Sequence, residues 1–148
     1  MIQAQKISPF LWFDHQAEEA AKFYTSVFKN SKIESVARNG GNVMAVGFSL
    51  DGQKFSALNG GPMFKFNPSV SFVVDCTDQA EVDFFWDKLT ADGGSESRCG
   101  WLTDKFGLSW QIIPEALPRL LSDPDPVVSQ RAMAAMLQMN KIEIDKLT

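Results

Sequence analysis

The sequence predicts an α+β fold made of two βαβββ modules followed by a C-terminal helix, and three observations lead to this prediction. The order of strand-like and helix-like patterns in the first third of the chain returns in the middle third. A short motif returns with it, because residues 16–18 and 79–81 both read QAE and an aromatic pair follows each. The last third differs, since a proline-interrupted segment there precedes a helical pattern.

The first module is predicted from one strand, one helix and three further strands. Residues 7–13 (ISPFLWF) are apolar and aromatic, as is typical of a strand. Asp14 is expected to cap the following helix, with Glu18 and Glu19 in the favourable first turn. One helical face is apolar and comprises Ala17, Ala20, Ala21, Tyr24, Val27 and Phe28. Short strands separated by turn residues follow at 32–38, 43–50 and 53–59.

The second module repeats this order. Residues 70–76 (VSFVVDC) form the predicted strand, and Val70 is expected to pack under a helix. Asp78 and Glu81 make a capping-box-like start for that helix, which is expected to end at 92–94 (DGG). Strands near 96–103 and 107–113 complete the module.

The last third predicts a helix with a defined start. Asp125 is expected as its N-cap and Pro126 as its first helical residue. The apolar stripe of this helix is Val128, Ala132, Ala135, Met136 and Met139. Two interpretations stay open, because such a stripe suits a helix that packs on its own domain and one that covers a neighbouring subunit. We expect one domain over 1–148, divided into a first module, a second module and a C-terminal helical extension at 1–66, 67–114 and 115–148.

Composition and charge exclude several classes of protein. Of the 148 residues, 45% are hydrophobic and 22% are charged, as in ordinary globular domains. The net charge is −4 and no basic run occurs, so nucleic acid and anionic membrane surfaces are poor partners. No apolar stretch has the length of a membrane span and the first residues lack the layout of a signal peptide, so a cytoplasmic location is expected. Cys76 and Cys99 are then expected to be reduced.

Few residues offer familiar catalytic or metal chemistry. The single histidine, His15, excludes a His-rich metal site within one chain and is expected to be solvated. The sequence contains no nucleophile elbow and no glycine-rich phosphate loop. Cys99 is expected to be a buried, inert thiol. Asp104 and Lys105 are expected to form a solvated turn pair.

Five segments of the chain carry a family resemblance. They are 7–13 (ISPFLWF), 17–24 (AEEAAKFY), 59–76 (NGGPMFKFNPSVSFVVDC), 99–114 (CGWLTDKFGLSWQIIP) and 123–142 (DPDPVVSQRAMAAMLQMNKI). Together they resemble the PhnB-like family of the vicinal-oxygen-chelate, or glyoxalase/bleomycin-resistance, superfamily, whose members are often labelled 3-demethylubiquinone 3-methyltransferase-like. The resemblance implies that both modules form a cupped eight-stranded mixed sheet around a pocket, in a homodimer. In metal-dependent members, His and Glu side chains hold a divalent metal that acts as a Lewis acid.

The metal positions of the superfamily, traced onto this chain, carry neutral side chains. The first strands of the modules give Ser8 and Ser69, and the fourth residue after a turn glycine gives Ser56 and Gln111. Hydroxyls and an amide offer no charge to a transition-metal cation, so we expect no metal and no cofactor. A methyltransferase that uses S-adenosylmethionine would need a glycine-rich strand–loop–helix turn, which the sequence lacks.

Nine residues are candidate ligand contacts, because strand alternation and the resemblance place them at the pocket. They are Ser8, Phe10, Trp12, Ser56, Ser69, Ser71, Trp101, Ser109 and Gln111. Alternatives stay open for three of them. Gln111 would otherwise hold the sheet together by a hydrogen bond to Ser69 or Ser109, and Phe10 and Trp12 would be plain core residues. No catalytic residue is assigned.

These features predict a metal-independent protein of this superfamily that binds a small organic ligand and forms a homodimer, without a nucleic-acid or membrane partner. A pocket lined by aromatic rings and hydroxyls suits such a ligand. An enzyme of the superfamily (a lyase, dioxygenase or transferase) with an unidentified reaction is the alternative. A structural or partner-binding dimer is the third hypothesis, which a pocket filled by side chains would favour.

Overall fold

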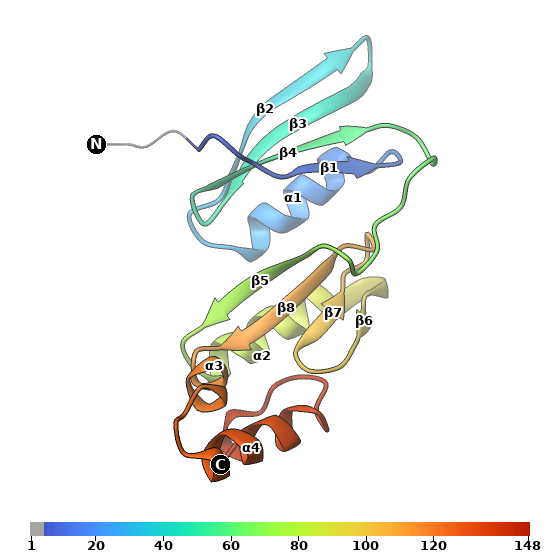
Figure 1. Ribbon diagram of the computed structural model, residues 1–148. Coiled ribbons are helices and arrows are strands. Elements are labelled where there is room, and N and C mark those ends of the chain that lie inside the picture. The colour runs from blue at the N-terminus through green and yellow to red at the C-terminus, as the bar shows by residue number, and fades with distance from the viewer. Residues whose placement is uncertain (1–4) are drawn as a thin grey trace, which may run out of the picture. The chain divides into compact units, whose positions relative to one another are not determined.

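The structure is a computed structural model that describes residues 5–148, and the chain divides into two compact units at residues 66 and 67 (Figure 1). The first unit is a βαβββ module. Its elements are β1 (Phe10–Phe13), α1 (Ala17–Val27), β2 (Lys32–Asn39), β3 (Asn42–Leu50) and β4 (Gln53–Asn59). The strand order is β1-β4-β3-β2, with β1 parallel to β4 and the other pairs antiparallel. A parallel pair needs a crossover between its strands, and α1 is part of it.

The core of the first unit lies between α1 and the sheet. Ala20, Ala21 and Tyr24 on the helix are fully buried, and the two small side chains let α1 lie close to the strands. The Tyr24 ring stacks on Phe48 with 6.4 Å between ring centroids, and Phe48 stacks on Phe55 at 5.4 Å. The predicted helical stripe therefore forms the expected apolar layer.

The start of β1 and the N-cap of α1 differ from the prediction. Strand β1 starts at Phe10, because Pro9 has no N–H to donate to the sheet. The Pro9 carbonyl still accepts a hydrogen bond from the Ser56 amide at 3.0 Å. The N-cap of α1 is Gln16 rather than Asp14, and the Gln16 side chain makes no capping bond. Instead, Asn59 Oδ1 accepts a hydrogen bond from the Ala17 amide at 2.8 Å, so the cap comes from β4.

The second unit begins with the second module. Its elements are β5 (Ser71–Cys76), α2 (Gln79–Thr90), the 3₁₀ turn η1 (Ala91–Gly93), β6 (Ser95–Glu96), β7 (Trp101–Thr103) and β8 (Ser109–Pro114). The strand order is β5-β8-β7-β6, with β5 parallel to β8. The predicted N-cap of α2 is confirmed, since the Asp78 carboxylate accepts a hydrogen bond from the Glu81 amide at 2.9 Å.

Two details of the second module differ from the prediction. The single strand expected at 96–103 is wrong, because Cys99 and Gly100 have φ angles of 59° and 87° and turn the chain between β6 and β7. The expectation that Val70 packs under a helix is also wrong. Val70 precedes β5 and is 63% exposed, because the turn after Pro68 ends only there.

The C-terminal extension holds two α-helices where the sequence predicts one. The unpredicted helix is α3 (Ala116–Leu121), whose Pro118 is tolerated in the first turns, where helix amides need no partner. Helix α4 (Pro126–Met136) begins at the predicted N-cap, where Asp125 Oδ1 accepts a hydrogen bond from the Val127 amide at 3.0 Å. A buried C-terminal cluster consists of Leu117, Met139, Ile142 and Leu147. The extension ends with the 3₁₀ turn η2 (Ile144–Lys146).

The structure confirms the α+β class, both βαβββ modules and the C-terminal helix. Ala132 of α4 is fully buried, so the helix packs within its own chain, and its covering of a neighbouring subunit stays a hypothesis. The joining of the two four-stranded sheets into one cup likewise stays a prediction. No helix within residues 5–148 is long and apolar enough to cross a membrane.

Asp104 is a buried structural residue, so the expectation of a solvated turn pair is wrong. The residue is 2% exposed. Its Oδ1 accepts hydrogen bonds from the Phe106 amide at 2.8 Å and the Leu108 amide at 3.1 Å, and its Oδ2 accepts one from Trp110 Nε1 at 2.8 Å. These bonds compensate the burial of the carboxylate and fix the turn that leads into β8.

We expect Asp104→Asn to destabilise the protein. The amide has one oxygen instead of two, so its NH₂ group would face a donor and one buried donor would lose its acceptor. Such a loss costs about 1–3 kcal/mol, and urea denaturation should show a free energy of unfolding lower by about 2 kcal/mol. Asp87→Asn, at an exposed position of α2, is the matched control and should change it by less than about 0.5 kcal/mol. Equal stabilities of the two variants would contradict the structural role.

The two cysteines should react very differently with alkylating agents. Cys76 is 1% exposed, and burial, followed by Glu81, Asp75 and Asp78, raises its pKa from 9.0 to about 12. The reactive thiolate of Cys76 therefore forms only well above neutral pH. Cys99 is half-buried, not fully buried as predicted.

In the folded protein at pH 8, iodoacetamide should modify Cys99 and leave Cys76 intact, as read by peptide mass mapping. Both thiols should react in denaturant, which serves as the control. If Cys76 were modified as fast as Cys99 in the native protein, the burial of Cys76 at the end of β5 would be contradicted.

Candidate functional site

The second sheet has one face covered by α2 and one face that α2 leaves open. Helix α2 packs behind β8 and β7 in Figure 1 and buries Val82, Trp86 and Leu89. On the strands, Trp110 and Ile112 are buried on the helix side. Residues at the alternate positions share the opposite side, because successive side chains of a strand point to opposite faces. The second open face, as we name it, comprises Ser71, Val73, Trp101, Thr103, Ser109 and Gln111.

Strand register brings four predicted ligand contacts together on the second open face. Ser71 of β5 pairs with Ser109 of β8, and Trp101 of β7 pairs with Gln111 of β8. Ser109 and Gln111 are two positions apart on one strand and therefore face the same side. These four residues are neighbours across three strands, although they are distant in sequence; Ser109 is buried, at 2% exposed, and the other three are partly exposed.

Gln111 is tied to a serine, but not to either serine that the sequence suggested. Its Nε2 donates a hydrogen bond to Ser71 Oγ at 3.0 Å, so the predicted partners Ser69 and Ser109 are wrong. In the parallel register, Val73 lies directly opposite Gln111, and Ser71 lies two residues before Val73 on the same face of β5. Within residues 5–148, no hydrogen bond reaches Gln111 Oε1 or leaves the indole N–H of Trp101. Both groups are thus available to a ligand beside the Gln111–Ser71 pair.

The four traced metal positions are divided between the two units, with Ser8 and Ser56 in the first and Ser69 and Gln111 in the second. Ser8 is exposed and precedes β1, and Ser69 is exposed in the turn before β5, where its amide bonds to Asn67 Oδ1 at 2.9 Å. Ser56 pairs with Phe10 on the first sheet. Their contact with a ligand stays a prediction.

The residues present do not fit a transition-metal centre. The Gln111–Ser71 pair is neutral, and its amide nitrogen is directed at the hydroxyl, whereas such cations take thiolate, imidazole or carboxylate donors. No group of three or more His, Cys, Asp or Glu within residues 5–148 could hold a metal ion. His15 is exposed, with its Nδ1 3.7 Å from Asp14 Oδ2, and lies at the end of β1.

The first sheet also has an open face, which carries the aromatic candidates. Phe10 is 60% exposed, so its interpretation as a core residue is wrong. The indole N–H of Trp12 donates to the Gly61 carbonyl at 2.9 Å, and its ring meets Phe64 edge-on with 5.0 Å between centroids. Gly60 lies directly against the Trp12 ring, and a Cβ there would be 2.4 Å from it. Trp12 can therefore offer a ligand its ring surface but not its N–H group.

Sequence reasoning missed three residues of these surfaces. Phe64 completes the ring pair with Trp12, and the segment NGGPMF at 59–64 is the only local sign of it, since glycines allow the close approach. Thr103 pairs with Ser109 and adds a hydroxyl to the second open face. Asp75 lies at the exposed end of β5 on the same side, opposite Ile113. Strand alternation, applied to the whole of β5 and β7, would have found the last two.

The fold does not supply the usual site for S-adenosylmethionine. A doubly wound nucleotide-binding fold places a glycine-rich turn between its first strand and helix. Here the corresponding turns are Asp14-His15-Gln16 after β1 and Thr77-Asp78 after β5, and neither contains glycine. Each sheet of the described chain has four strands in mixed orientation. These residues therefore do not fit the cofactor of a methyltransferase of that class.

Comparison with solved structures finds the same fold in several proteins. A PhnB protein from Bacillus cereus, named as a provisional 3-demethylubiquinone-9 3-methyltransferase, is 36% identical, with a TM-score of 0.69 over 74% of this chain and 99% of that chain. Protein PA1353 from Pseudomonas aeruginosa is 19% identical, with a TM-score of 0.63 over 76% and 98%. The fosfomycin resistance protein FosX from Mesorhizobium loti is 11% identical, with a TM-score of 0.60 over 83% and 100%. The last two show a shared fold alone.

Comparison with family models gives the family. The model described as 3-demethylubiquinone-9 3-methyltransferase matches residues 5–113, which span both modules and end before the C-terminal extension. Comparison with curated proteins found no match. The chain therefore belongs to the PhnB-like, 3-demethylubiquinone-9 3-methyltransferase family.

Proposed function

We propose that the protein binds a small, neutral organic molecule on the second open face, without a metal ion. The observation that carries the proposal is the Gln111–Ser71 hydrogen bond at 3.0 Å. It fixes a neutral amide on a sheet face with its oxygen available as an acceptor. Sites for small molecules combine apolar walls with a few placed polar groups, and here Trp101 and Val73 supply the walls.

The chemistry of this face favours an uncharged ligand with a hydrogen-bond donor. Gln111 Oε1 can accept one bond, and the N–H of Trp101 and the hydroxyl of Ser71 can each donate one. The patch of Ser71, Trp101, Ser109 and Gln111 holds no cation that would compensate a ligand's negative charge. A flat ring could lie on the Trp101 side chain, since aromatic pairs stabilise each other beyond their buried area.

The other predicted contacts belong to the same proposal. Ser8, Phe10, Trp12 and Ser56 would contact a ligand on the first unit, and Ser69 would do so at the start of β5. Phe10 and Trp12 would act through their rings, which agrees with the Trp12 N–H being bonded to Gly61.

We also propose a cytoplasmic homodimer, for which light scattering of the purified protein should give twice the chain mass of 16.4 kDa.

A fragment screen tests the binding site. We expect neutral aromatic amides and phenols to raise the melting temperature of the wild-type protein. Gln111→Ala should weaken the best hits about tenfold, because one or two hydrogen bonds are lost. Gln130→Ala, at an exposed position of α4, is the matched control and should bind them as the wild type does. Hits that bind both variants equally would place the ligand elsewhere.

Metal analysis tests the metal-independent part of the proposal. Protein purified without chelator should contain far less than one equivalent of zinc, nickel, iron or manganese by plasma mass spectrometry, because the Gln111–Ser71 pair is neutral. Added zinc should leave the melting temperature unchanged, since a ligand that binds only the folded state raises it. One tightly bound equivalent that Gln111→Ala releases would overturn this reading.

A further inference from the structure

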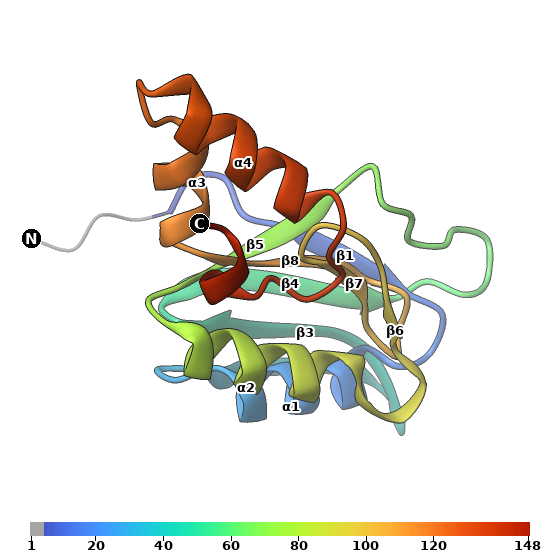
Figure 2. The same cartoon turned by 90° about the horizontal axis from the view of Figure 1, so that it is seen from below.

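The segment after α4 has no role in the proposed site so far, although it contacts the strands that form it. We name residues 137–147 the C-terminal strap. The strap lies outside the residues that match the family model. Figure 2 shows it running back from the end of α4 toward the first turn of α2. It is joined to the second module at two separate places.

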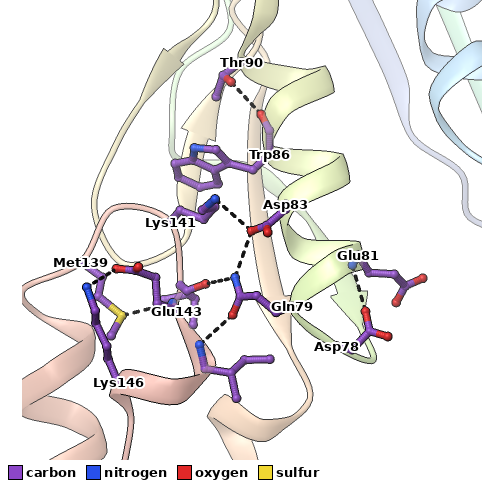
Figure 3. A network of polar contacts seen from close by, with 12 residues as sticks. Asp78, Gln79, Glu81, Asp83, Trp86, Thr90, Met139, Lys141, Glu143 and Lys146 are labelled. Carbon is purple, nitrogen blue, oxygen red and sulfur yellow. Dashed lines mark hydrogen bonds and ion pairs between the residues drawn. The ribbon is translucent and has the colours of Figure 1, made fainter.

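The first attachment is the side chain of Gln79 on α2. Its Nε2 donates to the Ile142 carbonyl at 3.0 Å, and its Oε1 accepts from the Ile144 amide at 2.8 Å (Figure 3). The side-chain amide thus bonds the backbone of the strap as a neighbouring strand would. The same Nε2 also donates to Asp83 Oδ1 at 3.0 Å. Gln79 therefore fixes the position of the strap along α2.

An ion pair reinforces this attachment. Lys141 Nζ lies 2.9 Å from Asp83 Oδ1 (Figure 3). The hydrogen bond between them lowers the pKa of Asp83 and raises the pKa of Lys141. Both side chains are partly exposed, so the pair adds orientation more than strength.

The second attachment is the turn that leads into β7. The Cys99 amide donates to the Met139 carbonyl at 2.8 Å, and the Gly100 amide donates to the Asn140 carbonyl at 2.7 Å. Arg98 adds a bond from Nη2 to the Leu137 carbonyl at 2.9 Å. The strap therefore holds the residues directly before Trp101, which is the aromatic wall of the proposed site.

The same contact reaches the strand that carries Gln111. The Gly100 carbonyl accepts a hydrogen bond from the Ile112 amide at 2.7 Å. A Cβ on Gly100 would lie 3.0 Å from Ile113 Cδ1 and 3.1 Å from Ile142 Cγ1, so strap, turn and β8 pack without spare room. Ile113 also packs against the C-terminal cluster. The strap closes the end of the second open face, two residues beyond Gln111.

We propose that the C-terminal strap, set in place by Gln79, positions Trp101 beside Gln111 and so shapes the end of the ligand site. Gln79 and Lys141 are positioning residues, because they act through the strap and the turn at 98–100 and lie outside the second open face. The inference rests on the proposed function for its consequence in binding. Its structural step, from Gln79 to Trp101, can be tested without any ligand.

The test uses the full chain labelled with 5-fluorotryptophan. The chain has four tryptophans, and Trp101→Phe assigns one ¹⁹F resonance to Trp101. Gln79→Ala should shift the Trp101 resonance and leave that of Trp12, assigned in the same way with Trp12→Phe, in place. In the same variant, hydrogen exchange of the Cys99 and Gly100 amides should rise at least about tenfold, because local opening becomes easier. Gln138→Ala, at an exposed position of the strap, is the matched control and should change neither reading.

A milder pair of variants covers the case in which Gln79→Ala fails to fold. Lys141→Ala should accelerate exchange of the same amides and move the Trp101 resonance, and Lys141→Arg should restore both. Faster exchange with an unmoved Trp101 resonance would overturn the inference, and so would unchanged exchange in the Gln79 and Lys141 variants.

Binding of the neutral fragments from the thermal-shift screen gives the final reading. If Gln79→Ala binds the fragments more weakly and also shifts the Trp101 resonance, the full inference is supported. A shifted Trp101 resonance with unchanged fragment binding would overturn the consequence of the inference for binding. If Gln111→Ala leaves fragment binding unaffected, the proposed function fails, and the ¹⁹F and exchange readings still decide the structural half.

Discussion

The parallel pairing of the first and last strand in each module decides which residues of this protein can share a surface. In the second module, β5 and β8 begin almost forty residues apart in sequence, yet Ser71 lies opposite Ser109 and Val73 lies opposite Gln111. A parallel pair needs a crossover, and α2 fills that role while covering one face of the sheet. The other face is thereby left to polar and aromatic side chains. The same pairing in the first module sets Phe10 beside Ser56.

The neutral pair on this face has a simple physical meaning. A carboxylate at position 111 would attract a cation, and the hydroxyl of Ser71 would then be a natural further donor. An amide removes the charge and supplies a donor and an acceptor, of which one is used by Ser71. The face therefore offers hydrogen-bonding groups and rings rather than charge. Trp12 on the first unit fits the same principle, because its N–H is bonded to Gly61 and only its ring is presented.

Periodicity in the sequence was enough to predict the modules, their helices and most strand positions. It succeeded where a pattern is local, as at the Asp78 cap, whose partner is three residues away. It failed where the partner is distant or unusual. Asn59 caps α1 from 42 residues away. Asp104 has the sequence context of a surface turn residue, and only the folded structure shows that Trp110 donates a hydrogen bond to it. In the candidate site, alternation found Gln111 and Trp101, but the choice of Ser71 over Ser69 depends on a register that no local pattern specifies.

The C-terminal strap shows how apolar and polar contacts divide a task. Ile142 and Leu147 are at most 1% exposed, and burying such side chains contributes roughly 1.5–3 kcal/mol each. The partly exposed Lys141–Asp83 pair adds less. Apolar packing has little directional preference, however, and does not by itself orient the backbone of the strap. Gln79 adds a directional contact, because its amide bonds both the carbonyl of Ile142 and the amide of Ile144. The apolar cluster thus keeps the strap attached, and the polar groups orient its backbone against α2 and the turn that leads into β7.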